Sequence, residues 1–289
     1  MRGKYCDLHA HSTRSDGEFS REEVIKMAIE SNIRVLSITD HNIPFDDLDE
    51  LQKKHPEIKL LNGAEVSTAY TVPDTGEMKE IHVVALDFRN TERFTKILAG
   101  NSFDSKDYVN SIIKKLRDAG LPAEFDYDSL KAEMKQEFIS RMAIARKLTA
   151  LKIVPDVENA FEEYIGDFGK RKAYVAPDVK KYIPLEKAVK EILCAGGIPI
   201  LAHLYSYNLT EKQAKDLALY FKSCGGTAME TLYSTYSQAQ REKLALLADD
   251  LGLAHSAASD FHGRGKKHSL DQKFPAEIYF KLMKKSDRK

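Results

Sequence analysis

The segment GGIPILAH, residues 196–203, decides the fold. Gly196 and Gly197 form a turn after an amphipathic run over Leu185–Ala195, and the apolar run that follows them ends at a histidine. A second amphipathic run, Thr210–Cys224, comes next. A short apolar strand between two helices is the repeating unit of α/β proteins, so this segment predicts an α/β fold with a parallel sheet, closed or open.

The same alternation extends along the chain in both directions. Downstream it predicts a strand, a helix and a strand: Ala228–Leu232, Ser237–Leu251 and Ala254–Asp260. Upstream it predicts four short strands: Lys4–His11, Arg34–Asp40, Ile58–Ser67 and Glu80–Leu86. Ser20 with Glu23 has the spacing of a capping box and predicts the start of a helix. The turn residues Asp74 to Gly76 indicate that the last two upstream strands form an antiparallel hairpin.

The strand pattern is interrupted in the middle of the chain. Four consecutive segments have helical spacing there: Asp104–Gly120, Asp126–Glu133, Glu137–Leu151 and Val157–Ile165. Gly120 and Pro122 end the first of them. We therefore expect one domain made of residues 1–100 and 180–289, with residues 101–179 inserted as a small helical domain.

Composition narrows the functional classes. Lys+Arg and Asp+Glu are equal at 44 each, so the charge gives no support for a broad nucleic-acid footprint, although a local basic patch stays compatible with it. No stretch approaches the roughly 18 apolar residues of a membrane helix. Cys6, Cys194 and Cys224 are far apart and form no CxxC motif. We expect a soluble, cytoplasmic protein, and the sequence leaves its oligomeric state open.

The motif DLHAHS, residues 7–12, is the strongest local indication of chemistry. His9 and His11 are two apart on a predicted strand, so both side chains leave the same face. Two imidazoles at the end of a strand can bind one metal ion. Two unrelated histidines near a terminus would give the same motif, so the motif alone leaves both interpretations open.

Other predicted strands also carry metal-ligand residue types, mostly at their ends. These residues are Asp16, Asp40, His41, Glu65, His82, His203, Glu230, Asp260 and His262. The C-terminal ends of parallel strands meet on one face of a barrel, and catalytic residues come from several of them. Because chance would not favour strand ends, the pattern predicts a metal centre. We expect His55 and His268 to be solvated and His255 to be structural.

Mixed imidazole and carboxylate ligands suit manganese, iron or zinc. About seven to nine such ligands exceed the roughly four to six that one ion takes, which indicates about two or three divalent ions bridged by a carboxylate such as Glu65. Such a cluster lowers the pKa of a bridging water and holds phosphoryl oxygens during in-line attack. Phosphate-binding loops, dinucleotide motifs and a serine elbow are absent from the sequence, and no organic cofactor is expected.

Several spaced motifs together resemble the PHP superfamily, the polymerase and histidinol phosphatase domain. They are DLHAHS, SDG, SITDHN, GAEVS, IHVVAL, LAH and SDFHG, in this order along the chain. They lie on both sides of the helical insertion and skip it. The resemblance implies an α/β fold of the distorted (β/α)7, TIM-like barrel type with a trinuclear metal centre.

The resemblance also implies how the ligands are divided. The first ion would be bound by His9, His11, Glu65 and Asp260. Glu65 would bridge to a second ion, which His82 and His203 also bind. The third ion would be bound by Asp16, His41 and His262. His203 or Asp260 would assist proton transfer as well.

A narrower resemblance lies in the insertion. The segments FISRMAIARKLTALKIV, AFEEYIG and RKAYVAPDV resemble stand-alone PHP phosphoesterases, which are similar to enzymes acting on nucleoside phosphates or on the 5′ end of short RNA. The resemblance implies that Arg141 faces the cleft and binds phosphate, and an exposed helix arginine is the alternative. Arg171 or Lys172 would assist it.

One segment departs from that group. The relatives commonly continue Ala-His with proline, whereas this chain reads LAHLYSYN, residues 201–208. Tyr205 and Tyr207 either line a base-stacking pocket or are loop aromatics. His203 is retained, so the departure bears on the substrate and leaves the metal site intact.

These motifs favour a metal-dependent phosphoesterase that hydrolyses a phosphate monoester of a small nucleotide, a nucleoside mono- or bisphosphate, with a metal-bridging hydroxide as nucleophile. The alternative is a 5′-3′ exonuclease on short RNA or DNA, which needs a local basic and aromatic groove. Histidinol phosphate hydrolysis and a non-catalytic module are two further hypotheses. The insertion does not resemble the histidinol phosphatase branch, and the full set of matched ligands argues against a non-catalytic module.

Overall fold

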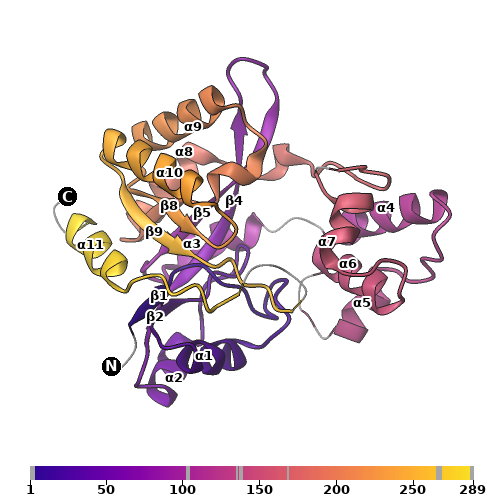
Figure 1. Cartoon of the computed structure of the whole chain (residues 1–289), viewed down its shortest axis with the longest axis horizontal. Helices are drawn as coiled ribbons and strands as arrows, with labels where there is room; N and C mark the ends of the chain where they lie inside the picture. Colours follow the sequence, from indigo (N-terminus) through magenta and orange to yellow (C-terminus); the bar gives the residue numbers. More distant parts are fainter. Residues whose placement is uncertain are drawn as a thin grey trace.

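The computed structural model describes residues 4–101, 105–134, 136, 139–167, 169–264 and 269–286. The protein has a mixed α/β fold with strands in two sheets, and a group of helices stands to one side of them (Figure 1). The expected α/β class is therefore confirmed.

The first sheet is small and parallel. It contains three strands in the order β1 (Tyr5–Asp7), β2 (Ile33–Ser37) and β3 (Lys59–Leu61). The helices α1 (Arg21–Glu30) and α2 (Leu48–Lys54) connect the strands. α1 begins with the capping box that the sequence predicts, because the Ser20 side chain accepts from Glu23 N–H while the Glu23 side chain accepts from Ser20 N–H.

The second sheet has the order β6-β4-β5-β7-β8-β9. Its strands are β4 (Gly63–Thr71), β5 (Met78–Leu86), β6 (Ile183–Pro184), β7 (Ile198–Leu201), β8 (Ala228–Tyr233) and β9 (Ala254–Ala258). The predicted hairpin is present, since β4 and β5 pair in antiparallel register. β7, β8 and β9 are parallel to one another, whereas β5 runs against both of its neighbours.

Helices cover the outer side of the second sheet. They are α3 (Glu92–Gly100), α8 (Leu185–Cys194), α9 (Glu211–Ser223) and α10 (Gln238–Leu251). The last helix, α11 (Glu277–Ser286), packs instead in a second buried cluster with β1 and the other face of β5. α8 to α10 lie together against the sheet (Figure 1). Their apolar faces join the strands in one buried cluster, which includes Ala188, Leu217 and Leu244.

Isolated bridges join the two sheets near the ends of their strands. Ala10 pairs with Phe261, and His41 pairs with Glu65, each in parallel sense. Glu65 N–H donates to Thr39 O at 3.0 Å, and Asn42 N–H donates to Glu65 O at 2.8 Å. The hydrogen-bonded ladders of the described residues form two sheets, and these bridges bring the polar strand ends together.

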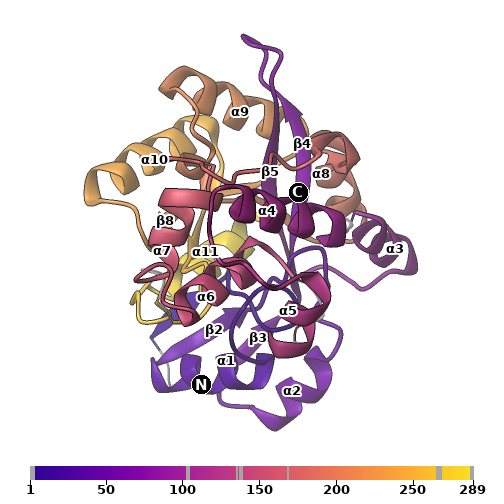
Figure 2. The same cartoon turned by 90° about the vertical axis from the view of Figure 1, so that its right-hand side faces the viewer.

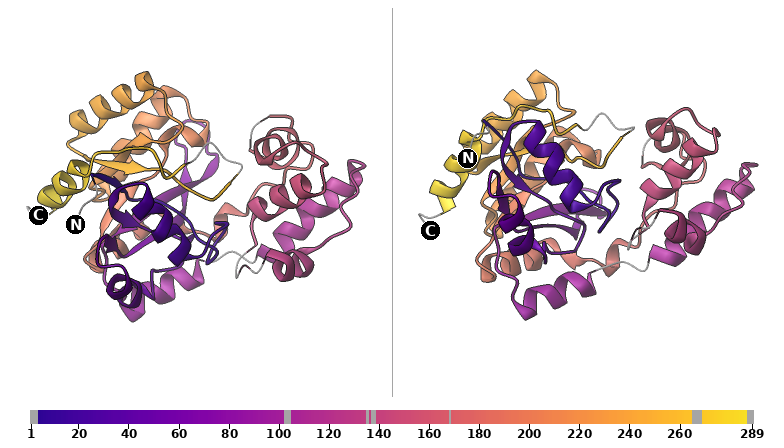
Figure 3. Two further views of the ribbon diagram at one scale, coloured as in Figure 1. Left: turned by 60° about the horizontal axis from the view of Figure 1, so that its bottom comes forward. Right: turned by 90° about the horizontal axis from the view of Figure 1, so that it is seen from below.

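The middle of the chain forms a helical group with its own core. It contains α4 (Ser105–Asp118), α5 (Tyr127–Met134), α6 (Arg141–Ala150), α7 (Val157–Ala160) and a π-helical turn, η1 (Phe161–Ile165). Figure 3 shows this group beside the sheets, and in Figure 2 it lies in front of them. Its buried residues, such as Ile112, Leu130 and Leu148, form a cluster distinct from the cores of the sheets.

Three sequence predictions of secondary structure were inaccurate. The single strand predicted over Ile58–Ser67 is two strands in different sheets, because the chain bends at Asn62. The first strand ends at Asp7 rather than His11. The helix predicted from Glu137 begins at Arg141, after the N-cap Ser140. Among the described residues, no helix combines the length and the apolar character needed to cross a bilayer.

Candidate metal centre

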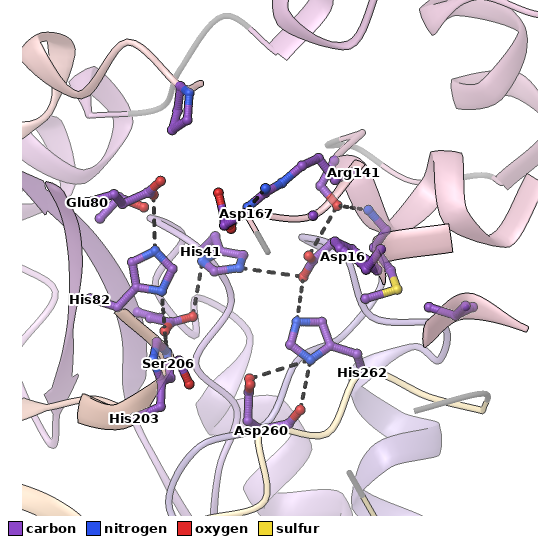
Figure 4. A pocket seen from close by; sticks show the side chains of 18 of the residues that line it. Asp16, His41, Glu80, His82, Arg141, Asp167, His203, Ser206, Asp260 and His262 are labelled. Carbon is purple, nitrogen blue, oxygen red and sulfur yellow. Dashed lines mark hydrogen bonds and ion pairs between the residues drawn. The ribbon is translucent and has the colours of Figure 1, made fainter. Parts of the chain in front are cut away.

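The nine residues that the family resemblance assigns as metal ligands lie together in one cluster, in which seven are buried and His41 and His82 are partly buried. They form four overlapping groups, in each of which the ligand atoms lie within 4.8 Å of one another. The groups are His11–Asp16–His41–His262, His9–His11–Asp260, His9–Glu65–His203 and His41–Glu65–His82. Figure 4 labels Asp16, His41, His82, His203, Asp260 and His262. Residues from the two ends of the sequence thus share one site.

The topology explains why these residues meet. His9 and His11 follow β1, His41 follows β2, and the two carboxyl-terminal ligands follow β9. The sequence predicted Glu65 at the end of a strand, but it lies near the start of β4, where it forms the bridge with His41. His82 is a central residue of β5 and pairs with Ser67 of β4. Because β5 is antiparallel to both of its neighbours, a residue from its middle reaches the ligand cluster.

Glu65 lies at the middle of the cluster. Its Oε1 is 2.7 Å from His82 Nδ1 and 2.9 Å from His203 Nε2. Its Oε2 is 3.1 Å from His41 Nδ1 and 3.2 Å from His11 Nε2. Burial alone would raise the pKa of the Glu65 carboxyl, but the surrounding imidazoles hold this pKa well below its usual range. A carboxylate with imidazoles on both oxygens is suited to bridge two ions.

Asp260 lies beside the first histidine pair. Its Oδ1 is 3.2 Å from His11 Nε2 and 3.5 Å from His9 Nε2. The Tyr233 hydroxyl donates to the other oxygen, Oδ2, at 2.6 Å. Asp260 has a φ of 55° and His203 a φ of 24°, a left-handed backbone conformation that residues other than glycine rarely adopt. Strained backbone at two neighbouring candidate ligands is typical of a functional site.

Asp16 gathers a second set of imidazoles. Its Oδ1 is 3.2 Å from His262 Nε2, 3.7 Å from His11 Nδ1 and 3.8 Å from His41 Nε2. Figure 4 shows Asp16 between His41 and His262. Burial raises the pKa of the Asp16 carboxyl, and the imidazoles of His262 and His41 lower it well below its usual range.

The chemistry of the donor set fits divalent metal ions. His9 Nε2 and His11 Nε2 face each other at 3.1 Å, and at the same time both face carboxylate oxygens. Asp16 Oδ1 and His41 Nδ1 are buried without a hydrogen-bond partner among the described residues. Buried carboxylates and imidazoles normally are paired or coordinate metals. The converging lone pairs therefore match a site for cations.

Carboxylates outside this set hold the imidazoles in place. Glu230 Oε1 is 2.7 Å from His9 Nδ1, and Glu230 Oε2 accepts from His203 N–H at 2.7 Å. Glu80 Oε1 is 3.0 Å from His82 Nε2. Such contacts fix the tautomer and orientation of metal-binding histidines. The sequence marked Glu230 as a strand-end acid without a role, and Glu80 was missed, although its i, i+2 spacing from His82 places both on one face of β5.

Asp40 is another strand-end acid that the sequence marked. It lies outside the four metal-binding groups and instead accepts from Ser12 N–H, from the hydroxyls of Ser12 and Ser15, and from Arg21 Nε. These contacts tie down the loop between His11 and Asp16. Asp40 is therefore a structural anchor of the site.

The cluster opens onto a cavity of about 610 Å³. Candidate ligands such as Glu65 and Asp260 form one wall, and residues of the helical group, including Met142 and Phe161, form the other. Arg141 lines this cavity; its Nη1 donates to Asp167 Oδ2 at 3.0 Å, and its guanidinium lies 6.0 Å from the centre of the Phe161 ring. A cation therefore faces the candidate metal centre across the cavity.

The other predicted substrate contacts lie elsewhere. Arg171 stacks on the Tyr174 ring at 4.1 Å, and Lys172 pairs with Glu163 at 3.2 Å. Both are exposed, and neither lines the cavity. Tyr205 N–H donates to the Tyr236 hydroxyl at 2.9 Å, and its ring also lies outside the cavity lining.

Tyr207 packs behind the centre. Its hydroxyl accepts from His82 N–H at 2.8 Å and donates to Ala202 O at 3.1 Å. Its ring centre lies 5.3 Å from that of His203. These contacts link β5 to the end of β7 and favour the loop-aromatic alternative for this residue.

The remaining histidines lie away from the cluster. His55, expected to be solvated, is buried, because it ends α2 where the chain turns back into β3. His255 contacts the Thr231 hydroxyl at 3.0 Å and Asp249 at 3.1 Å, on the far side of the sheet from the ligand set. His268 lies outside the described residues.

Comparison with known proteins places this geometry in a family. Residues 7–176 match the sequence profile of the PHP domain, which is more than half of the chain. The chain belongs to the PHP domain family. The resemblance inferred from the motifs is thereby confirmed, and the protein is a metal-dependent phosphoesterase, a hydrolase of phosphate esters.

The similar proteins cover almost the whole PHP chain. A Haemophilus influenzae protein named 5′-3′ exoribonuclease is 35% identical over 264 residues, 91% of each chain. A Chromobacterium violaceum protein named 3′,5′-nucleoside bisphosphate phosphatase is 30% identical and covers 90% of this chain and 88% of its own. A solved Chromobacterium violaceum structure, described as an amidohydrolase with bound sulfate and no metal, has a TM-score of 0.80 at 27% identity, over 97% of this chain and 96% of that chain.

Proposed function

We propose that this PHP protein hydrolyses a phosphate monoester of a small nucleotide, a nucleoside mono- or bisphosphate. The observation that carries the proposal is the cavity between the ligand cluster and Arg141. Its volume of about 610 Å³ falls within the range of roughly 300–1,000 Å³ that is typical of pockets for small molecules. The relative named 3′,5′-nucleoside bisphosphate phosphatase supports a nucleotide with more than one phosphate.

The nine clustered residues would hold three divalent ions, manganese, iron or zinc. His9, His11, Glu65 and Asp260 would bind one ion; Glu65 would be shared with a second, bound also by His82 and His203. Asp16, His41 and His262 would bind the third. The bound ions activate water and neutralise charge on the phosphoryl oxygens. His203 or Asp260, which lie at the edge of the cavity, would accept or return a proton.

Residues 101–179 would form an inserted helical domain that covers the site, and residues 1–100 with 180–289 would form one distorted seven-stranded barrel of the TIM-like type. The separate helical core supports the first part of this division. The isolated bridges between the two sheets support the second. On this arrangement the substrate enters between the barrel and the insertion.

Arg141 would bind a phosphate of the substrate. Its guanidinium stays charged at all relevant pH and offers a planar pair of donors that matches phosphate. In the structure the Arg141 guanidinium donates to the Asp167 carboxylate, so a bound phosphate group would replace that carboxylate or bind beside it. Half of the Asp167 side chain is exposed, which leaves room for this exchange.

A 5′-3′ exonuclease acting on short RNA is the second candidate. The relative with 35% identity carries that name. The first nucleotide of a 5′-phosphorylated RNA has a phosphate on its 5′ oxygen and a phosphodiester on its 3′ oxygen, so its phosphate positions match those of a nucleoside 3′,5′-bisphosphate. The two candidates therefore use one centre and differ in whether the cavity accepts a continuing chain.

The experiment uses the Mn²⁺-loaded protein and four compounds: 5′-AMP, 3′,5′-bisphosphoadenosine, histidinol phosphate and a 5′-phosphorylated RNA oligomer. Released phosphate and oligomer length are followed together. Phosphate release from a mononucleotide with the oligomer intact is the expected result. Stepwise shortening of the oligomer at a higher kcat/KM than for the mononucleotides would make the exonuclease the primary function, and release from histidinol phosphate alone would contradict both.

A further inference from the structure

One side chain of the helical insertion, Arg146, donates hydrogen bonds to two backbone carbonyls of the candidate metal centre. Arg146 Nη1 donates to Asp16 O at 3.1 Å, and Arg146 Nη2 donates to His262 O at 2.5 Å. The two acceptors lie near opposite ends of the 289-residue sequence, yet one planar guanidinium spans them. Because both acceptors are neutral carbonyls, these two hydrogen bonds act on the geometry of the two loops.

Two neighbours of Arg146 strengthen this junction. The Ser140 hydroxyl, at the N-cap of α6, donates to Asp16 Oδ2 at 3.2 Å. Gln136 Nε2 donates to Gly17 O at 2.6 Å. The insertion thus contacts the side chain and carbonyl of Asp16 and the carbonyl of the next residue.

The two loops that Arg146 contacts contain candidate ligands of one ion, Asp16 and His262. Asp16 and His262 face each other at 3.2 Å and belong to the group that also contains His11 and His41. In the loops themselves, Glu18 N–H donates to His262 O at 2.9 Å. His262 O therefore accepts from its neighbouring loop and from the insertion at once, so its direction, and that of the attached side chain, depends on both.

We propose that Arg146 is a positioning residue for the ion bound by Asp16, His41 and His262, and that it couples occupancy of this ion to docking of the helical insertion. The proposal rests on the metal assignment of the proposed function but is independent of the substrate. An ion that draws the two side chains together also brings their carbonyls to the spacing of the guanidinium. By linkage, docking of the insertion then raises the affinity for that ion by the same factor.

The test counts ions per chain and measures their affinities by titrating metal-free protein with Mn²⁺. In Arg146→Met, affinity for one ion should fall about 10- to 100-fold, the usual effect of losing a side chain that orients a metal ligand, while the other ions bind as in the wild type. Arg146→Lys keeps the charge but not the planar fork, so it should give an intermediate affinity.

Lys147→Met is the matched control, since Lys147 is the next residue of α6 and pairs with Glu133 away from the centre. It should bind all ions as the wild type does. A folded Arg146→Met protein that binds every ion with wild-type affinity would overturn the proposal. If Arg146→Met loses that one ion and the Mn²⁺-loaded wild-type protein hydrolyses none of the four compounds, this proposal stands and the nucleotide function is refuted instead.

If Arg146→Met does not fold, hydrogen exchange in the wild type decides. Mn²⁺ should slow exchange of the amides in α6 relative to chelated protein, whereas those of α9 on the far side of the sheet should change little. Equal exchange in α6 with and without bound Mn²⁺ would contradict the coupling.

Discussion

Glu230 Oε1 lies 2.7 Å from Nδ1 of His9, and this contact turns Nε2 of the same ring toward the cluster of candidate ligands. The second oxygen of Glu230 accepts from the backbone N–H of His203. One buried carboxylate therefore orients ligands that come from β1 and β7.

Replacing Glu230 tests this orienting role. Glu230→Ala leaves the His9 ring without its partner and should lower metal affinity about 10- to 100-fold. Glu230→Gln keeps an oxygen acceptor and should lose less. Metal content after dialysis against graded free Mn²⁺ gives the comparison, and equal affinity in the alanine variant would refute the role.

Glu65 is the second test, because every assignment of two adjacent ions shares it. Glu65→Ala should abolish turnover and lower the number of ions bound per chain, since it removes contacts to five imidazoles at once. Elemental analysis and phosphate release are measured on the same sample. Full activity in this variant would exclude the bridging role.

Arg141 should affect the substrate and spare the metals. Arg141→Ala is expected to raise KM or lower kcat for a phosphorylated nucleotide while the ion count stays at the wild-type value. Arg171→Ala is the matched control, because that arginine stacks on Tyr174 outside the cavity. If Arg171→Ala impairs turnover as much as Arg141→Ala, the position of the phosphate has been wrongly assigned.

A substitution of Tyr207 tests whether this residue is a structural loop aromatic or stacks on a base. Tyr207→Phe keeps the ring but removes the hydroxyl that joins His82 N–H to Ala202 O. An unsatisfied buried group costs about 1–3 kcal/mol, so the free energy of unfolding should fall by about that amount, with no change in preference among nucleobases. Denaturant unfolding and a panel of four bases check this; unchanged stability with altered base preference would favour stacking.

The cysteines should differ sharply in reactivity. Burial and the charge of nearby Asp7 together raise the pKa of the Cys6 thiol to about 12, so almost no thiolate forms at pH 8. Cys194 is exposed. A thiol reagent should therefore modify Cys194 in the native protein and Cys6 only after unfolding, with Cys194→Ala as control. Rapid native labelling of Cys6 would contradict the described packing.

The sequence predicted most of the fold because its strands and helices are short, regular and well capped. It failed at Asn62, where one apolar run becomes two strands. The Asn62 side chain accepts from Phe45 N–H and donates to Phe88 O, contacts between distant segments. The adjacent Gly63 approaches β2 so closely that a Cβ would lie 2.2 Å from Ser37 Oγ. Neither constraint is visible in a local pattern.

The candidate ligands were predictable because metal-binding residue types recur near the ends of strands. The residues that support them were not, since Glu80 and Arg146 act through contacts that only the folded chain creates. The predicted phosphate contacts of basic residues depended on tertiary contacts in the same way. Lys172 looks available for phosphate in the sequence, but it is paired with Glu163.

The most direct test of the central claim is phosphate release from 3′,5′-bisphosphoadenosine by one preparation, first stripped with a chelator and then reconstituted with Mn²⁺. We predict no release from the stripped protein and release in proportion to the ions restored. Equal release before and after chelation, with metal content verified as zero, would contradict a metal-dependent phosphoesterase. So would a fully loaded protein that releases no phosphate from this or any other phosphate ester.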